Sequence, residues 1–313
     1  MPNTIARALA IAVFLSTFTD PSFAQAVRVP GTSVTLAPPD GFSLAQQYPG
    51  FERPEAQASI MVTELPGPAA DMIRSMTGPT LAGNGVMLIS AGDAVIRDKP
   101  ARLLHVRQNT TRGEALKWIL IAGDTKTTIM IVGTFTEGVA PGVGDVIKQS
   151  LLTTSWASSA PSNPFEGLPF RVAATARLKL ARRVSNMLMF TESGTAGTPG
   201  STEALYIAGH SLGQGQLGDV RRFSESRARQ TTLITGVTNF AGHAIQVGGL
   251  DAYELEADAA DARSGRAMRL YQVMIPDETG YFILQGLIRA DRAGEIVPEF
   301  KALTASFRTL ASQ

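Results

Sequence analysis

Two stretches of the chain repeat one pattern of apolar and polar positions. They occupy residues 116–135 and 270–288, and each has an apolar run, a turn that begins at an aspartate, and a second apolar run. Short apolar runs bounded by turn residues are typical of buried strands. Each stretch is therefore predicted to form a β-hairpin. Three pairs of residues align between the copies without a gap: Trp118 with Tyr271, Asp124 with Asp277, and Gly133 with Gly286.

The surrounding pattern predicts further strands and helices in a similar order in both halves. In the first half we expect strands at 33–36, 42–44, 58–63, 86–96 and 101–107, and helices at 69–76 and 144–156. In the second half we expect a strand or hairpin at 170–180, strands at 186–190, 204–208 and 251–258, and a helix at 218–230. A last helix is expected to carry Ile296, Phe300, Leu303, Phe307 and Leu310 on one face.

Short loops between consecutive strands favour antiparallel pairing. The hairpin strands are apolar on both faces, which indicates that both faces are covered. The predicted fold class is therefore α+β, with two similar domains, each a mainly antiparallel β-sheet flanked by a middle helix and a C-terminal helix. A stretch rich in Pro and Ser, residues 157–168, is the predicted linker between domain 1 (27–156) and domain 2 (169–313).

The N-terminal residues have the pattern of a secretory signal peptide. Arg7 precedes an apolar run at 8–18, and an Ala-Gln-Ala triplet ends at residue 26. The run is far shorter than the roughly 20 residues of a membrane-spanning helix. We expect residues 1–26 to be removed and the mature protein to be exported, without a transmembrane segment. Its compartment would be the periplasm in a Gram-negative host, and otherwise the exterior.

The order of elements resembles the PsbP-like α/β/α-sandwich superfamily. The resemblance rests on the Pro-Asp-Gly-Phe-Ser-Leu opening at 39–44, taken as a hairpin, on the hairpin at 116–135, and on Ser150, Leu151, Leu152 and Trp156 in a final helix. It covers residues 34–156 and, more loosely, 170–310, where the Pro-Asp-Gly-Phe opening is missing. The resemblance implies exported accessory or binding modules that are mostly not enzymes, and it implies no catalytic residue.

Composition narrows the possible chemistry. The 313 residues include no cysteine and three histidines, and the formal net charge is +1. The absence of cysteine excludes disulfides, thiol catalysis and cysteine-bound zinc. The net charge is too small to attract nucleic acid to the molecule as a whole. No phosphate-binding loop, dinucleotide fingerprint or H-E-x-x-H motif occurs. We therefore expect no cofactor and no nucleic-acid partner.

One motif resembles a catalytic one. Gly209-His210-Ser211-Leu212-Gly213 matches G-x-S-x-G, the nucleophile elbow of α/β-hydrolases, and an apolar run precedes it. The hydrolase triad also needs a later acid and a later histidine, but the one later histidine, His243, is only 32 positions on. The repeat places the motif opposite Thr63-Glu64-Leu65-Pro66-Gly67, an ordinary strand end. A serine esterase or lipase that uses Ser211 is therefore the alternative, not the main hypothesis.

Two charged groups are weaker candidates. Glu254, Glu256 and Asp258 alternate along one strand, so they could offer oxygen ligands to Ca²⁺ or Mg²⁺, although a solvated strand face explains them as well. An arginine-rich helix could bind an anionic ligand or be only the polar face of an amphipathic helix. Its arginines are Arg221, Arg222, Arg227 and Arg229.

The main functional hypothesis is an exported, non-enzymatic binding or accessory protein of the cell envelope. Its partner or small ligand, and its oligomeric state, do not follow from the sequence. The alternatives are the serine hydrolase and a purely structural assembly factor.

Overall fold

The computed structural model describes residues 25–110, 113–136, 138, 141–157, 163–196, 203–212 and 217–310. Nearly all of the predicted signal peptide and residues 158–162 of the predicted linker therefore lie outside the described residues. Within the described residues, no helix has the length and apolar character that would let it cross a membrane.

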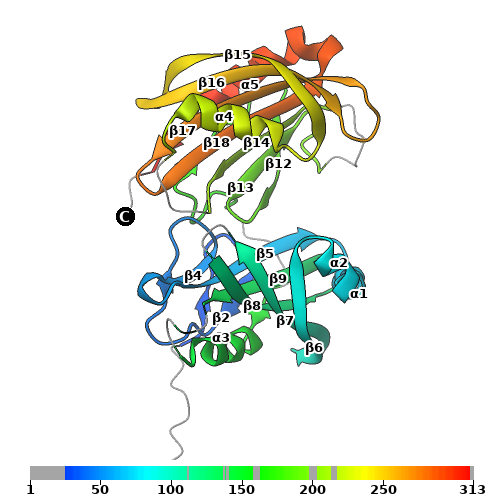
Figure 1. Ribbon diagram of the computed structural model, residues 1–313, viewed down its shortest axis with the longest axis vertical. Helices are drawn as coiled ribbons and strands as arrows, with labels where there is room; N and C mark the ends of the chain where they lie inside the picture. Colours follow the sequence, from blue (N-terminus) through cyan, green and yellow to red (C-terminus); the bar gives the residue numbers. More distant parts are fainter. Residues whose placement is uncertain are drawn as a thin grey trace, which may run out of the picture.

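The described residues form an α+β fold built on two seven-stranded sheets (Figure 1). The first sheet has the order β3-β4-β5-β9-β8-β7-β6, and every neighbouring pair is antiparallel, as predicted. Its strands are β3 (Ser43–Leu44), β4 (Gly50–Arg53), β5 (Ala58–Pro66), β6 (Val86–Ile96), β7 (Lys99–Thr110), β8 (Gly113–Gly123) and β9 (Thr127–Phe135). A 3₁₀ turn, η1 (Pro54–Ala56), separates β4 from β5.

The second sheet has the order β12-β13-β14-β18-β17-β16-β15, again antiparallel throughout. In both sheets the first three strands of the chain lie side by side, and the last four follow in the reverse of their order in the sequence. They are β12 (Lys179–Val184), β13 (Met187–Thr191), β14 (Leu205–His210), β15 (Ile234–Val247), β16 (Leu250–Asp261), β17 (Ala267–Asp277) and β18 (Gly280–Arg289).

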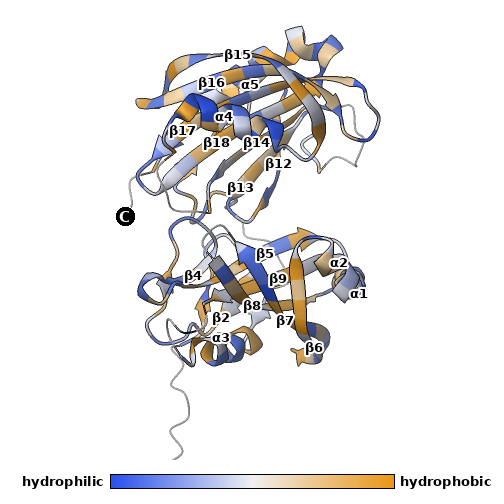
Figure 2. Ribbon diagram, viewed as in Figure 1, coloured by the Kyte–Doolittle hydropathy of each residue, from blue (hydrophilic) through white to orange (hydrophobic). Residues whose placement is uncertain are grey.

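Helices cover both faces of each sheet because the central strands are apolar on both faces. In the first half, α3 (Val143–Leu152) packs on one face, and α1 (Ala69–Ser75) and α2 (Gly78–Ala82) pack on the other. In the second half, α5 (Ala293–Ala305), which follows the 3₁₀ turn η2 (Ala290–Arg292), covers one face and α4 (Val220–Arg229) the other. Figure 2 shows α4 as a hydrophilic segment lying over strands that carry many apolar residues.

Both C-terminal helices end earlier than predicted. The helix expected to reach residue 156 ends at Leu152, and β10 (Ser155–Trp156) then pairs with β2 (Val34–Leu36), which also pairs with β1 (Val27–Arg28). The last helix likewise ends at Ala305, and β19 (Arg308–Thr309) pairs with β11 (Phe170–Arg171). Apolar spacing missed these ends because Trp156 and Phe307, which follow the two helices, are buried as well.

The hydroxyl groups that follow the two helices make the same bonds. Thr153 Oγ1 donates to the Ser150 carbonyl at 2.7 Å and accepts from the Ala37 amide at 2.9 Å. Ser306 Oγ donates to the Leu303 carbonyl at 2.6 Å and accepts from the Ala173 amide at 2.9 Å.

The predicted hairpin between residues 33–36 and 42–44 is wrong. The first of these segments pairs with β1 and β10, whereas β3 pairs with β4, a strand that the pattern did not predict. Pro38 and Pro39 lie between them and have no N–H to donate, so this segment cannot continue a ladder.

A glycine in each sheet lets the C-terminal helix approach closely. Gly133 pairs with Trp118, and Gly286 pairs with Tyr271. A Cβ at Gly133 would occupy the space of Ile147 on α3, and a Cβ at Gly286 would lie 2.7 Å from Phe300 Cγ on α5. Ile147 and Phe300 are both fully buried, so neither can move aside freely.

We expect Gly286→Ala to destabilise the protein by about 1–3 kcal/mol, because the added methyl group overpacks the contact with Phe300. Urea unfolding, followed by circular dichroism, measures this. The matched control is Gly294→Ala in α5, where a Cβ meets nothing within 4 Å and where alanine favours the helix. Equal stability of Gly286→Ala and wild type would show that the helix does not depend on this contact.

Candidate functional site

Ser211 continues the ladder between β14 and β18. Its amide donates to the Tyr281 carbonyl at 2.8 Å, and the Tyr281 amide donates to Ser211 Oγ at 3.1 Å. β14 is antiparallel to both of its neighbours. A nucleophile elbow needs instead a parallel sheet and a tight strand-to-helix turn. Gly213, the last residue of the motif, lies outside the described residues.

His210 forms a buried pair with Asp277. The distance between His210 Nε2 and Asp277 Oδ2 is 2.8 Å, and the His210 side chain is only 1% exposed. Burial acts to raise the pKa of the Asp277 carboxyl, but hydrogen bonds from His210, the Thr279 hydroxyl and the Glu278 amide outweigh it and hold that pKa below its ordinary value. Because an ionised carboxylate only accepts, Nε2 carries the proton in this pair.

The two nitrogens of the His210 ring differ in their hydrogen bonding. One nitrogen bonds to Asp277, and the other, Nδ1, is buried without a hydrogen-bond partner among the described residues. The ring packs edge-on against Phe282, with 4.5 Å between the centroids. The structure therefore places this histidine, at the end of β14, in a carboxylate pair.

The strand end that carries His210 lies against the first half of the chain. Asn186 Nδ2 donates to the His210 carbonyl at 2.6 Å and to the Gln47 carbonyl at 2.9 Å. Gln47 Nε2 in turn donates to the Thr279 carbonyl at 3.3 Å. One asparagine therefore ties β14 to the loop between β3 and β4. In Figure 1 the lower end of β13 and the loop before β4 lie where the upper and lower halves meet.

A cleft of about 590 Å³ opens beside this junction. We call it the acidic cleft because its titratable groups are three carboxylates and one histidine. Both halves of the chain contribute to it: Gln46, Gln47 and Glu52 come from the first half, and the other lining residues come from the second. Its side chains include Glu52, His210, Asp277, Glu278, Thr279 and Phe282.

A second cleft of about 350 Å³ lies where β5 and the turn after β8 face the turn between β12 and β13. We call it the basic cleft because Lys126, Arg182 and Arg183 line it together with one acid, Glu64. Burial lowers the pKa of the Arg183 guanidinium to about 10, against the opposing effect of Glu166 and Glu64, so Arg183 stays charged at neutral pH.

The arginines predicted as an anion patch have partners on their own helix. Arg221 and Arg229 form ion pairs with Glu225 at 3.1 and 3.9 Å, and Arg222 lies 3.6 Å from Asp219. Arg227 donates to Gln230 Oε1 at 3.0 Å. The remaining helix face is held by Gln272, whose Nε2 donates to Ser224 Oγ at 2.7 Å. The arrangement fits the polar face of an amphipathic helix.

The three acids of the alternating strand are neutralised by basic side chains. Lys301 Nζ lies 2.8 Å from Glu254 and 3.0 Å from Glu256, and Arg269 lies 3.1 Å from Asp258. The Tyr271 hydroxyl also donates to Glu254 at 3.0 Å. In the part of the chain that the structure describes, no group of three or more acidic or histidine residues could hold a metal ion.

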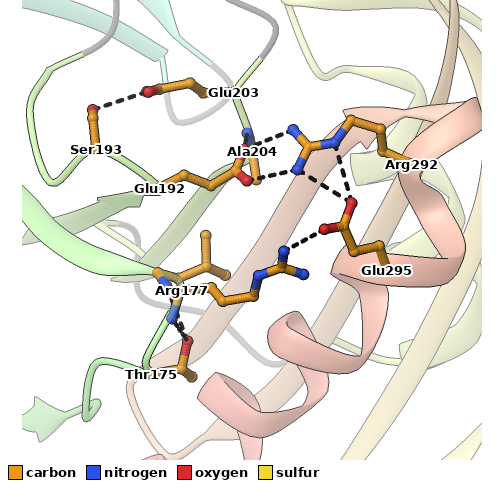
Figure 3. Close-up of polar contacts among 9 residues, drawn as sticks. Thr175, Arg177, Glu192, Ser193, Glu203, Ala204, Arg292 and Glu295 are labelled. Atoms are coloured by element: carbon orange, nitrogen blue, oxygen red, sulfur yellow. Dashed lines mark hydrogen bonds and ion pairs between the residues drawn. The ribbon is translucent and has the colours of Figure 1, made fainter.

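A further ion-pair cluster braces the second half (Figure 3). Arg292 forms a two-point contact with Glu192, with distances of 2.9 and 2.6 Å, and Glu192 also accepts from the Ala204 amide at 2.9 Å. Glu295 joins Arg292 to Arg177. The hydrogen bond from Arg292 holds the pKa of the Glu192 carboxyl below its ordinary value. These residues tie the segments around β13 and β14 to the start of α5 and point to stability, not binding.

No protein-family model and no curated protein matches the chain. It is similar to a solved Pseudomonas aeruginosa protein of unknown function, with 17% identity over 44% of this chain and 99% of that one, at a TM-score of 0.32. LpqN of Mycobacterium tuberculosis, involved in cell envelope biogenesis, is similar at 12% identity over 45% and 83% of the two chains (TM-score 0.31). The Pseudomonas aeruginosa immunity protein TplEi, complexed with a peptide, is similar at 10% identity over 94% and 100% (TM-score 0.29).

The sequence pointed to His210 only as part of the serine motif, and it indicated neither cleft. The signal available in the sequence was the pairing of two repeat positions. Asp277 is the repeat partner of Asp124, and the segment 209–213 is the repeat partner of the segment 63–67. Both copies have the aspartate, but His210 stands where the first copy has Glu64. This difference between the copies becomes visible only when the two repeats are aligned.

We expect Asp277→Asn to lower the free energy of unfolding near pH 6, because the His210 and Thr279 bonds to the charged carboxylate weaken. The Asp277 pKa is lowered in the folded state, so its contribution is present above the unfolded pKa and is lost as pH falls through the folded one. The difference between wild type and variant should therefore shrink below about pH 4. Urea unfolding at several pH values measures it. A difference that stays constant between pH 6 and pH 3 would contradict the assignment, and Asp40→Asn, at an exposed position, is the control.

Proposed function

We propose that the protein is an exported, non-enzymatic binding protein of the cell envelope whose ligand or partner occupies the acidic cleft. The observation that carries this proposal is that carboxylates from both halves, Glu52 on one side and Asp277 and Glu278 on the other, line one cleft of about 590 Å³. Export is supported by the signal-peptide pattern of residues 1–26.

The lining of the acidic cleft favours a ligand with a cationic group and an apolar part. Glu52 and Glu278 can accept hydrogen bonds from an amine or a guanidinium group, and such charge-assisted bonds are the strong ones. Phe282, Leu250 and Leu310 offer apolar surface in the same cleft. A mixed lining of this kind, with a few placed polar groups, is typical of ligand sites.

We also infer that the two halves are copies of one unit. The common strand order, the matching Thr153 and Ser306 hydrogen bonds and the paired glycines support this. The predicted PsbP-like resemblance describes one such unit with helices on both faces of an antiparallel sheet. A cleft at the junction of two copies would be a property of the pair, which neither copy has by itself.

The serine hydrolase is the competing hypothesis, and a fluorophosphonate probe tests it. We expect no labelling of the purified mature protein, because the antiparallel ladder holds Ser211 Oγ on the Tyr281 amide and His210 is bonded to Asp277. In-gel fluorescence measures labelling, with a known serine hydrolase as the positive control. Labelling of wild type that is lost in Ser211→Ala would overturn the non-enzymatic assignment.

Native mass spectrometry of protein purified from the host envelope tests the binding proposal. We expect a bound species on wild type that is lost from the double variant Glu52→Gln, Glu278→Gln, because the carboxylates that would hold its cation are gone. The control is Glu114→Gln, a glutamate in another hairpin, whose ion pair with Arg107 is exposed. A species that the double variant retains would favour a structural assembly factor that binds elsewhere. Bare protein in every sample would contradict the proposal.

A further inference from the structure

The two clefts occupy corresponding places in the two halves. Glu64 lies at the end of β5 and pairs with Ile129, and His210 lies at the end of β14 and pairs with Phe282. Ile129 and Phe282 are 153 positions apart, as are Asp124 and Asp277 in the two repeat turns. Glu64, which lines the basic cleft, is therefore the counterpart of His210, which lines the acidic cleft.

Each cleft is formed by the repeat turn of one half and the first hairpin of the other. In the basic cleft, Lys126 and Thr127 follow β8, Arg182 and Arg183 lie near the end of β12, and Ser185 lies in the turn between β12 and β13. In the acidic cleft, Asp277, Glu278 and Thr279 lie at the end of β17 and in the turn after it, and the lining residues of the first half are Gln46 and Gln47, between β3 and β4, and Glu52 on β4. The geometry of the two clefts therefore corresponds, whereas their charges are opposite.

Arg183 is built into the junction by several groups. Its Nε donates to the Ser185 carbonyl at 2.6 Å, and its Nη1 donates to the carbonyls of Pro164, at 3.2 Å, and Glu166. Gly31 has φ of +73°, and a Cβ there would fall within the guanidinium group. The backbone of the first half thus leaves room for this one side chain of the second.

Two polar atoms at this place are buried without hydrogen-bond partners among the described residues. They are Nη2 of Arg183 and Oγ of Ser185. A buried donor without a partner costs free energy, more so when it is charged. The nearest acids are already engaged: Glu64 accepts from the Ser33 amide at 3.0 Å, and Glu166 forms an ion pair with Arg28. Within the lining itself, three cations face one carboxylate.

We propose that the basic cleft binds a small anionic group, a carboxylate or a phosphate. Lys126 and Arg182 supply its charge, and Nη2 of Arg183 and Oγ of Ser185 donate to the anion and so gain the partners that they lack. A volume of about 350 Å³ admits such a group together with a short organic part. This site differs from the arginine helix α4, whose cations have acidic or amide partners, and it does not rest on what the acidic cleft binds.

Isothermal titration calorimetry of the full mature protein tests the proposal, with sodium acetate and inorganic phosphate as separate probes at constant ionic strength. We expect at least one probe to bind, and Lys126→Gln to weaken it about tenfold, since a charge-assisted bond is lost. Ser185→Ala should weaken it less, and it removes no hydrogen bond that the described residues show. The tighter probe identifies carboxylate or phosphate as the ligand group.

Arg222→Gln on α4 is the matched control because it removes one exposed positive charge outside the cleft. It should leave the affinity unchanged. Two results would overturn the proposal. One is the absence of heat with either anion up to about 10 mM, which is about ten times a dissociation constant of about 1 mM. The other is equal weakening of binding by Arg222→Gln and Lys126→Gln. Circular dichroism checks that each variant is folded. Arg183 is left unchanged in these variants because its carbonyl contacts hold the junction together.

Discussion

The close approach of the C-terminal helix to each sheet is the packing constraint on which the other features depend. At Gly133 and Gly286 the missing side chain lets Ile147 and Phe300 reach the sheet surface. Only a helix at this distance buries the apolar face of the hairpin that precedes it. The hairpin strands are thereby held from both sides, and their turns project from the sheet in a defined direction. Those turns carry Lys126 in one half and Asp277 in the other, so the packing of the helices also places the charges of the clefts.

The junction of the halves combines one set of contacts with two opposite charge environments. Asn186 and Gln47 join loops through backbone carbonyls, which carry no net charge. The side chains that line the two clefts differ in charge. The acidic cleft has carboxylates together with His210, and the basic cleft has guanidinium and ammonium groups together with Glu64. Two binding environments can therefore arise from one arrangement of strands, because the contacts that hold the junction do not depend on the residues that line the clefts.

Partner groups decide which charged residues are available for binding. The arginines of α4 and the acids of β16 stand out in the sequence, yet each contacts a polar or charged neighbour. Lys301 sits on α5 above Tyr271, with 5.9 Å between its nitrogen and the ring centroid, and thereby serves two carboxylates at once. Ser211 and His210 are adjacent in sequence, but one is bonded to the Tyr281 amide and the other to Asp277. The partners of α4 lie on the helix itself and at its ends, whereas those of the β16 acids, Ser211 and His210 come from other segments of the chain.

The sequence by itself determined the class of the fold, since apolar runs and short turns specify antiparallel strands and their approximate ends. It also indicated the repeated hairpin and its glycines, because both are local patterns. It could not give the ends of the C-terminal helices, since an apolar position such as Trp156 is buried equally well by a helix or by the short strand that the structure shows. Only the tertiary structure decided where the clefts lie, because Glu52 and Glu278, or Lys126 and Arg183, meet through contacts between segments far apart in the chain. Burial and hydrogen bonding at that junction depend on three-dimensional proximity, which no spacing of residues along the chain expresses.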